Sequence, residues 1–390
     1  MINQQKITER LLSEYERLKK GNEEFMGYPL AKDLSFQELA PFLDLQINNV
    51  GDPFTTSSLT VDTKNIEIEV IQFFANLLRA KQENTWGYVT NGGSEGNLYG
   101  LYLAREIYPK GIVYYSEETH YSVKKNLHLL NIPNIVIKSD IKGEMDYGDL
   151  KSTVLLNRRY PAIFFLNIGT TMKEAIDQVA KIKLIIQELA IKDYYIHCDA
   201  AFLGVILPFV PDSPAFDFRS GIDSISISGH KFLGSPIPCG VVLCKKSHSD
   251  KIGKSISYVD TMDTTISGSR NGLSPLILWY TLKKLGFDGL QKRVLQCLKV
   301  ADYAERRLKE EGIQVFRNER ALTLVIEKPS KEILNKYQLA VEGNIAHILA
   351  VPGITKQHID HFIHDLLISE MEEDLGQKDE LKMNEYLKSF

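Results

Sequence analysis

A lysine just after an apolar run is the first candidate for chemistry in this sequence. Lys231 ends the motif Ser228-Gly229-His230-Lys231, which follows SISIS and precedes the Gly- and Pro-containing stretch FLGSPIPCG. One interpretation is a surface lysine at a turn. The other is a Schiff-base lysine, whose amine binds an aldehyde cofactor covalently. Pyridoxal 5'-phosphate (PLP) is the usual cofactor of this kind, and it acts as an electron sink.

A PLP site makes further demands, and other residues of the chain meet them. An acid must hold the pyridine nitrogen protonated, and Asp199 ends the apolar run YIHCD, 32 residues before Lys231. A carboxylate buried at a strand end is costly unless a cation pairs with it, and a pyridinium is such a cation. A group must also stack on the ring, and His120 follows the apolar run GIVYYS. Each residue alone also has a structural explanation, as a turn Asp or a structural His.

The phosphate of PLP needs a cradle, and the segment NGGSEGN at 91–97 is the candidate. It follows an apolar run and opens a predicted helix, so that backbone N–H groups and the helix dipole face a dianion. The segment is not a Walker motif, because no Lys-Ser/Thr follows its glycines. It also lacks the spacing of a dinucleotide fingerprint. Gly-Gly-Ser, His, Asp and Lys occur in this order along the chain, each after an apolar run. This order indicates a PLP site more specifically than any one of these residues alone.

Cysteine chemistry is the competing interpretation, and the sequence gives it less support. Cys239 and Cys244 have no matching second pair, so a zinc site is not favoured. Cys198 neighbours Asp199 and is expected to be buried, which makes it the weaker candidate nucleophile. No G-x-S-x-G elbow of a hydrolase is present.

These residues must be positioned by a sheet, and the stretch from 86 to 246 predicts one. Short apolar runs alternate there with amphipathic helical ones, which indicates a mostly parallel sheet wrapped in helices. The runs are continuously apolar, as in strands buried on both faces. The predicted strands are 86–91, 111–116, 134–139, 162–169, 194–200, 224–228 and 240–244.

The segments on either side predict an arm before the sheet and a small lobe after it. Apolar spacing near 3.6 residues predicts a first helix near 7–18, a second over 65–80 and a helical stretch over 270–310. Strands are expected at 313–318, 322–328 and 345–352, followed by a helix over 358–372. The expected organisation is an N-terminal arm (1–85), a large PLP-binding domain (86–285), a small C-terminal domain (286–370) and a solvated acidic tail (371–390).

Composition and charge exclude several classes of protein. The 390 residues are 44% hydrophobic and 25% charged, with a net charge of −4, so no basic footprint for nucleic acid is present. Four cysteines do not make a disulfide scaffold. The polar amino terminus is not a secretory signal, and the apolar runs are too short to cross a bilayer. We therefore expect a cytoplasmic protein with no membrane or nucleic-acid partner.

The motifs together resemble the group II PLP-dependent amino-acid decarboxylases. More narrowly, NGGSEGN, ETHYSV, YIHCDAA and SGHKFLGSPIPCG resemble bacterial histidine decarboxylases and plant-type serine decarboxylases. The likeness includes INNVGDP, WGYVTNGG, NIGTT and GSRNG, and it covers nearly the whole chain from about residue 27. It implies the α/β architecture of PLP-dependent fold type I, which is aspartate aminotransferase-like. It also implies a seven-stranded, mostly parallel sheet, a small C-terminal α+β domain, and a homodimer with its active site at the subunit interface.

The resemblance also implies roles for individual residues. Lys231 forms the Schiff base, Asp199 pairs with the pyridine nitrogen, His120 stacks on the ring and Ala201 lies under its other face. The implied phosphate contacts come from Gly93, Ser94, Ser228 and His230, and Thr170 is placed near the ring oxygen. Ser269 and Arg270 are expected to reach the cofactor or substrate from the neighbouring subunit, and Asn49 and Asp52 to line the substrate pocket. Tyr258, in a mobile loop, is the expected proton donor.

The resemblance favours L-histidine as the substrate, with L-serine as the alternative. One position departs from both relatives, which tend to have His after GSRNG, whereas this chain has Leu273. If position 273 lines the pocket, the loss of an imidazole favours a less polar substrate such as an aliphatic amino acid. Two other classes remain open, a fold type I lyase of different outcome and a catalytically inactive relative, because one fold hosts many reactions.

Overall fold

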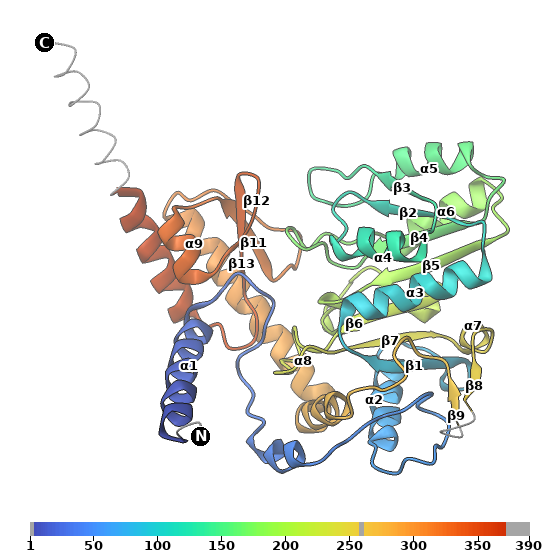
Figure 1. Cartoon of the computed structure of the whole chain (residues 1–390). Coiled ribbons are helices and arrows are strands. Elements are labelled where there is room, and N and C mark those ends of the chain that lie inside the picture. Colours follow the sequence, from blue (N-terminus) through green and yellow to red (C-terminus); the bar gives the residue numbers. More distant parts are fainter. Residues whose placement is uncertain (1–3, 257–260, 372–390) are drawn as a thin grey trace, which may run out of the picture. The chain divides into compact units, whose positions relative to one another are not determined.

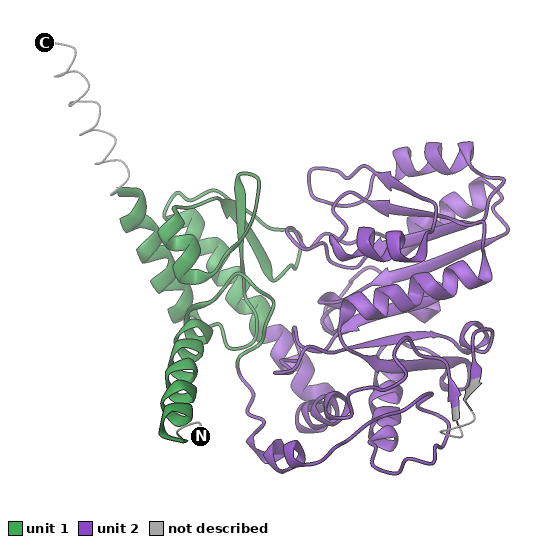
Figure 2. Ribbon diagram, in the orientation of Figure 1, with its two compact units in different colours: residues 1–32, 296–390 green, residues 33–295 purple. Residues whose placement is uncertain are grey.

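The computed structural model describes residues 4–256 and 261–371. The chain divides into two compact units, which Figure 2 shows in different colours. The larger unit is residues 33–295, and the smaller unit joins residues 1–32 to residues 296–390. The arm expected over 1–85 is thus shared between the two units. The expected boundary near 286 lies close to the division after residue 295.

A seven-stranded sheet forms the centre of the larger unit (Figure 1). Its order is β1-β7-β6-β5-β4-β2-β3. β7 runs antiparallel to both neighbours, and the other four pairings are parallel. This confirms the seven predicted strands and the mostly parallel sheet. The strands are β1 (Thr85–Thr90), β2 (Ile112–Ser116), β3 (Asn134–Ile137), β4 (Ala162–Asn167), β5 (Tyr194–Asp199), β6 (Ser224–Ser228) and β7 (Gly240–Lys245).

These segments form strands because apolar and β-branched residues dominate them, with polar residues mainly at their ends. All residues of β1, β2, β4 and β6 are buried, as expected for strands covered on both faces. α3 packs across β5, β6 and β7, and α4 packs against α3. The main helices of this unit are α2 (Lys64–Leu77), α3 (Gly93–Ile107), α4 (Ser122–Leu130), α5 (Tyr147–Leu156) and α6 (Val179–Glu188).

Short elements complete the larger unit, and most of them are too short to show a period in the sequence. The hairpin of β8 and β9 was not predicted. Tyr258, the expected proton donor, lies between these two strands and outside the described residues. The short elements are η1 (Gln37–Asp44), η2 (Gln82–Asn84), η3 (Leu203–Val205), η4 (Leu207–Phe209), η5 (Phe218–Ser220), α7 (Lys246–Ser249), β8 (Lys254–Ile256) and β9 (Thr261–Asp263).

The long helix α8 (Leu273–Glu310) begins in the larger unit and ends in the smaller one. It confirms the helical stretch predicted over 270–310. The helix is kinked at Gly286, whose φ of 61° is outside the helical region and is favourable only for glycine.

The smaller unit contains a four-stranded antiparallel sheet of order β10-β11-β13-β12. Its other elements are α1 (Gln4–Glu24), α9 (Lys331–Tyr337) and a helix over 356–371. Met26 links the amino-terminal segment to this unit, because its N–H donates to the Tyr337 carbonyl and its carbonyl accepts from Leu349 N–H, both at 2.9 Å. The strands are β10 (Val315–Phe316), β11 (Thr323–Glu327), β12 (Ala340–Glu342) and β13 (Ile345–Leu349).

Candidate active site

Most of the residues predicted to bind the cofactor gather where the carboxyl ends of the parallel strands meet. β5 ends at Asp199, β4 ends at Asn167 directly opposite it, and β6 ends at Ser228, three residues before Lys231. This edge is where ligands bind in open α/β sheets. A recess of about 140 Å³ opens there, lined by Gly93, Ser94, Asn97, His120, Ser122, Asn167, Gly169, Thr170, Thr171, Asp199, Ala201, Ser228, His230 and Lys231.

Lys231 is the one lysine in the lining of this recess. Among the described residues its amine has no hydrogen-bond or ion-pair partner. Burial lowers the pKa of Lys231, and the nearby charge of Asp199 opposes part of that effect. A lowered pKa favours the neutral amine, which is the form that attacks an aldehyde. The amine is therefore both available and activated.

Two hydrogen-bond donors hold the Asp199 carboxylate in place. Asn97 Nδ2 donates to Asp199 Oδ2 at 2.7 Å, and the backbone N–H of Ala201 donates to Asp199 Oδ1 at 3.1 Å. The residue is 8% exposed and lines the recess. These two hydrogen bonds fix the orientation of the carboxylate in the lining of the recess.

His120 lines the recess as a neutral ring. Its Nδ1 lies 2.8 Å from Ser122 Oγ at the first turn of α4. Burial lowers the pKa of His120, while the charge of Asp199 raises it and that of Lys231 lowers it. A flat, uncharged imidazole held in this way is suited to stacking on an aromatic ring.

The amino terminus of α3 offers a cradle for an anion. Gly92 has a φ of 149°, and no side chain caps the helix there. A Cβ on Gly93 would lie 2.7 Å from Ser228 Oγ, so only glycine allows this approach. First-turn N–H groups have no intrahelical acceptor, and Ser94, Ser228 and His230 line the same recess. This donor set fits a phosphate, as the sequence predicted.

Together these features fit a phosphorylated aldehyde such as PLP. The unpartnered Lys231 amine suits the aldehyde, Asp199 suits a protonated ring nitrogen, His120 suits the ring face, and the uncapped end of α3 suits the phosphate.

Thr170 is buried in the lining, where its Oγ1 accepts the N–H of Ala175 at 3.0 Å. Next to it, Asp177 braces the end of β4 by accepting from both the N–H and the Nδ2 of Asn167, at 2.8 and 3.0 Å. Burial raises the pKa of Asp177 to about 7, and the hydrogen bonds from Asn167 and Met145 oppose that rise. Asp177 is thus a supporting residue that the sequence analysis did not single out.

Asn49 and Arg270 lie in a different buried cluster, centred on Glu67. Asn49 Nδ2 donates to Glu67 Oε2 at 2.8 Å, and Arg270 forms an ion pair with Glu67 Oε1. Arg270 also donates to the Gly51 carbonyl at 2.9 Å. Neither Asn49 nor Arg270 lines the recess of their own chain. Their expected roles in a substrate pocket therefore stay predictions.

Asp52, Ser269 and Leu273 also lie outside that recess. Asp52 Oδ2 accepts from Trp86 Nε1 at 2.9 Å, and its Oδ1 accepts from the N–H of Phe54 at 2.7 Å. Ser269 Oγ accepts from Asn48 Nδ2 at 3.2 Å and is exposed. Leu273 is the first residue of α8. The expected functions of these three residues stay predictions.

The lining also contains polar residues that the sequence analysis missed as site residues. Asn97 belongs to the predicted NGGSEGN motif, and Asn167 opens the NIGTT motif. A helical spacing of four residues from Gly93 to Asn97 could have indicated that Asn97 shares the face of the cradle. Ser122 follows His120 by two residues, and only the turn between them brings both side chains to the recess.

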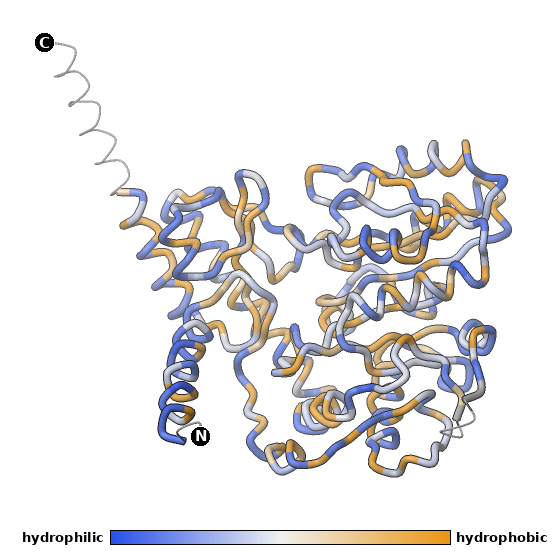
Figure 3. The backbone as a smooth tube through the Cα atoms, viewed as in Figure 1, coloured by the Kyte–Doolittle hydropathy of each residue, from blue (hydrophilic) through white to orange (hydrophobic). Residues whose placement is uncertain are grey.

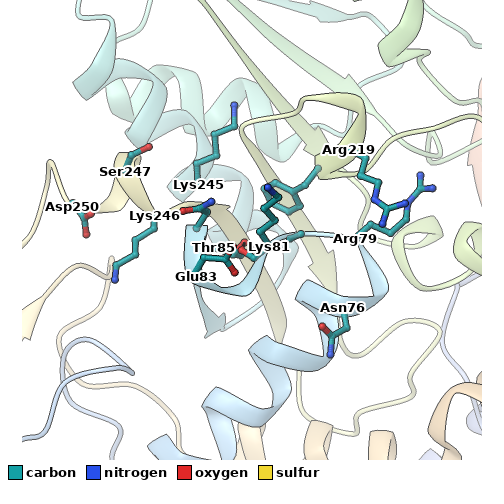
Figure 4. Close-up of a pocket in the computed structure, with 13 residues that line it drawn as sticks. Asn76, Arg79, Lys81, Glu83, Thr85, Arg219, Lys245, Lys246, Ser247 and Asp250 are labelled. Atoms are coloured by element: carbon teal, nitrogen blue, oxygen red, sulfur yellow. Dashed lines mark hydrogen bonds between the residues drawn. The ribbon is translucent and has the colours of Figure 1, made fainter.

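A second cavity, of about 880 Å³, lies elsewhere in the larger unit (Figure 4). It is lined by residues from the end of α2, the start of β1 and the β7–α7 junction, among them Asn76, Thr85 and Lys245. Two of its cations already have anionic partners, since Arg79 pairs with Asp217 and Lys245 with Asp223. The cavity contains none of the predicted site residues.

Two other kinds of site were searched among residues 4–256 and 261–371. No group of three or more His, Cys, Asp or Glu side chains is placed to hold a metal ion. No helix in this part of the chain has the length and apolar character needed to cross a membrane. All four cysteines are free and buried, and burial raises the pKa of Cys198 well above its ordinary value. Such a thiol is a poor nucleophile.

Comparison with known proteins identifies strong similarity over most of the chain. The family model described as "Pyridoxal-dependent decarboxylase conserved domain" matches residues 28–328. A histidine decarboxylase of Mesorhizobium japonicum is 44% identical over 352 residues, which cover 90% of this chain and 95% of that protein. Serine decarboxylase 2 of Oryza sativa subsp. japonica is 44% identical over 343 residues, covering 87% of this chain and 73% of that protein.

Solved structures share the architecture. The L-methionine decarboxylase of Streptomyces sp. 590, solved with L-methionine methyl ester, superposes with a TM-score of 0.87 at 25% identity. The superposition covers 94% of this chain and 95% of that one. The mostly parallel seven-stranded sheet and the small antiparallel sheet thus have the architecture of fold type I, as the sequence predicted.

Proposed function

The chain belongs to the pyridoxal-dependent decarboxylases, and from this membership we propose that it converts L-histidine to histamine and carbon dioxide. It is a PLP-dependent amino-acid decarboxylase, that is, a carboxy-lyase. The observation that carries the proposed site is the convergence of Lys231, Asp199 and His120 in the lining of one recess at the carboxyl edge of the sheet.

Each of these side chains has a distinct task in the proposed reaction. Bound PLP supplies an electron sink for the pair released when the bond between Cα and the carboxylate breaks. Lys231 Nζ would hold the cofactor at its aldehyde carbon. Asp199 holds a proton at the pyridine nitrogen through its anionic carboxylate. His120 and Ala201 orient the ring by contacting its two faces.

The phosphate end of the cofactor is assigned to the uncapped amino terminus of α3. The N–H groups of Gly93 and Ser94, the hydroxyls of Ser94 and Ser228, and His230 are the proposed donors. Thr170 is placed near the ring oxygen. These contacts would hold the ring in one position, so that a substrate attached to it is presented in one orientation.

Protonation of Cα after carbon dioxide leaves is assigned to Tyr258, which lies outside the described residues. A Tyr258→Phe protein should lose amine yield relative to carbon dioxide release. An unchanged yield would rule this residue out as the donor.

The substrate is chosen on the relatives, and one residue keeps the choice open. A histidine decarboxylase and a serine decarboxylase are each 44% identical to this chain. Leu273 replaces the His that both relatives tend to have after GSRNG. If this position lines the pocket, a less polar substrate such as an aliphatic amino acid becomes the better one, whereas L-serine remains the alternative that the relatives suggest. Two alternatives remain outside the decarboxylases: a fold type I lyase that catalyses a different reaction, and a catalytically inactive relative. The presence of Lys231 and Asp199 argues against the inactive relative.

A panel of the twenty L-amino acids tests the proposal, with carbon dioxide and amine both measured. We expect the highest kcat/KM for L-histidine, with one amine formed for each carbon dioxide released. A Lys231→Ala protein is the control and should be inactive with every substrate. Turnover of serine or leucine without histidine would contradict the substrate but not the family. A product other than an amine would contradict decarboxylation itself.

We also propose that the enzyme is a cytoplasmic homodimer whose active site lies at the subunit interface. Apolar side chains of α1 support the dimer, because Leu11, Tyr15 and Leu18 are 58–66% exposed in the single chain. Figure 3 shows hydrophobic bands recurring among hydrophilic ones along this helix. In a dimer, Ser269 and Arg270 of one subunit are assigned to the cofactor site of the other, and Asn49 and Asp52 to the substrate pocket.

A further inference from the structure

A continuous chain of hydrogen bonds leads from the protein interior through Asn97, which lines the recess, to the Asp199 carboxylate. Tyr195 OH donates to Ser224 Oγ at 2.9 Å, and Ser224 Oγ lies 2.7 Å from His197 Nδ1. His197 Nε2 lies 3.0 Å from Asn97 Oδ1, and Asn97 Nδ2 donates to Asp199 Oδ2 at 2.7 Å. All five side chains have little or no contact with solvent.

The chain has a single direction that the chemistry of its groups determines. An ionised Asp199 can only accept, so the Asn97 amide must present its NH₂ group and leave its oxygen facing His197. That oxygen can only accept, so His197 carries its proton on Nε2. His197 Nδ1 is then an acceptor for the hydroxyl of Ser224, which in turn accepts from Tyr195. Every donor in the series therefore points toward Asp199.

His197 continues this series of hydrogen bonds as a neutral ring. Its side chain is fully buried, and burial lowers its pKa to about 3, so the ring is neutral at physiological pH. Phe165 lies beside it, with ring centroids 5.1 Å apart. A neutral donor stabilises the anion of Asp199 through its dipole and leaves the charge of Asp199 free to pair with a cation in the recess.

Two glycines of α3 let the helix approach closely enough for Asn97 to reach both partners. A Cβ on Gly96 would lie 2.2 Å from Ser226 Oγ, and one on Gly100 would lie 2.1 Å from His197 Nδ1. Any other residue at these positions would push α3 away from β5 and β6. Gly96 and Gly100 lie within one helical turn of Asn97 on either side, so the segment GSEGNLYG provides both the cradle and the insertion of Asn97.

We propose that Asn97 and His197 are positioning residues that hold the Asp199 carboxylate ionised and aimed at the recess, so that the cofactor ring nitrogen keeps its proton. This inference rests on the proposed place of the cofactor ring against Asp199 and does not depend on which amino acid is decarboxylated. Asn97 acts directly on Asp199. His197 acts through Asn97, by fixing which end of the amide faces the carboxylate.

PLP labelled with ¹⁵N at the ring tests this inference, because the nitrogen resonance reports whether the ring carries a proton. The holoenzyme is titrated with pH as wild type and as Asn97→Leu, which keeps the approximate volume of Asn97 and removes its donor. We expect the Asn97→Leu substitution to weaken proton binding at the ring nitrogen roughly 10- to 100-fold, the effect of losing one hydrogen bond to a charged group. Asp199→Asn is the positive control and should leave the ring nitrogen unprotonated.

His197 variants separate positioning from packing. His197→Gln retains a donor near the place of Nε2 and should titrate like the wild type. His197→Leu should resemble Asn97→Leu. Where the leucine variant of either residue binds no PLP, the alanine variant of the same residue, which also removes the donor, is measured in its place and should show the same loss of proton affinity.

The outcomes distinguish this inference from the proposed cofactor site. A wild-type ring nitrogen that is unprotonated, or that does not respond to Asp199→Asn, would overturn the placement of the ring. A wild-type nitrogen that loses its proton in Asp199→Asn but titrates unchanged in the Asn97 and His197 variants would overturn the role of the hydrogen-bond chain alone.

Discussion

The contrast between Lys231 and Asp199 explains how this recess is prepared for a ligand. Asp199 is satisfied by two donors from its own chain, whereas the Lys231 amine has no hydrogen-bond partner among the described residues. A buried polar group without a partner costs free energy, and proteins retain such groups mainly where a ligand completes them. In the single chain, Asp199 therefore already has hydrogen-bond donors, whereas the Lys231 amine is left without one of its own.

Single residues could be predicted where a short motif carried the chemistry. Lys231, Asp199 and His120 each follow an apolar run, and all three line the recess. Asn97 and His197 could not be assigned their contacts, because the hydrogen bonds join residues 100 and 102 positions apart. His197 also occupies a strand position that a core residue would fill. The proposed role of His197 depends on how closely α3 packs against the sheet, and this distance cannot be predicted from the sequence.

The buried histidine gives a pH dependence of stability that can be measured. His197 has a folded-state pKa of about 3 against 6.5 for an ordinary histidine, because burial disfavours its charged form. Below pH 6.5 the unfolded chain takes up a proton that the folded protein refuses, so stability falls as the pH falls toward 3. The loss is about 1.4 kcal/mol per pH unit in this window.

The measurement compares denaturation midpoints of wild type and His197→Gln from pH 7 downward. Other groups titrate in both proteins, so the difference between the two curves isolates His197. We expect the wild type to lose stability faster as the pH falls, and the variant to lack this contribution. Parallel curves would show that His197 becomes charged in the folded protein as readily as in the unfolded one.

Among secondary-structure elements, those with a clear period or a long apolar run were predictable and the short ones were not. The seven strands of the large sheet and the long helix α8 were predicted within a few residues. β12 (Ala340–Glu342) has three residues and is held only by antiparallel pairing with β13, so no local pattern marks it. The hairpin of β8 and β9 escaped prediction for the same reason.

The glycines of α3 give a prediction for this element. Gly100→Ala places a methyl group 2.1 Å from His197 Nδ1, so α3 or β5 must move. Overpacking of this kind costs about 1–3 kcal/mol, although alanine is the better helix former. We therefore expect a lower thermal denaturation midpoint for this variant.

Gly21→Ala in α1 is the matched control. Its new Cβ would lie 3.4 Å from Gln338 Nε2, an ordinary contact, so the helix gains up to about 1 kcal/mol. The midpoint should be unchanged or higher. Equal stability of Gly100→Ala and wild type would mean that α3 does not depend on close contact with His197.

For the whole molecule, the division into two units was the hardest feature to predict. Residues 1–32 belong with residues 296–390, although about 260 residues separate them along the chain. The link is local and specific, since Met26 is 1% exposed and bonds to the backbone of both Tyr337 and Leu349. Composition marks residues 25–32 only as an irregular stretch, so no pattern in the sequence indicates that they pair with Tyr337 and Leu349.

Assembly gives a prediction at this scale. Ile7, Leu11, Tyr15 and Leu18 fall on one side of α1 and are all exposed in the single chain. If a second copy covers them, Leu11→Glu combined with Leu18→Glu should shift the protein toward monomer, because two buried charges would lack partners. Sedimentation velocity at several concentrations measures the shift.

The control for assembly is Ser13→Glu, which adds a negative charge on the opposite side of α1, where the residue is exposed. It should leave the dimer intact. A dimer that survives the double leucine substitution would exclude α1 from the interface. A wild-type protein that sediments as a monomer would contradict the proposed homodimer.

The central claim is that Lys231 is the residue that binds the aldehyde of PLP at the carboxyl edge of the sheet. Reduction of the PLP-loaded protein with borohydride fixes the cofactor to its lysine, and peptide mass spectrometry then identifies the modified residue. The account predicts one phosphopyridoxyl group per chain, on the peptide that contains Lys231. A modification on another lysine, or an unmodified Lys231 in protein that has bound PLP, would contradict it.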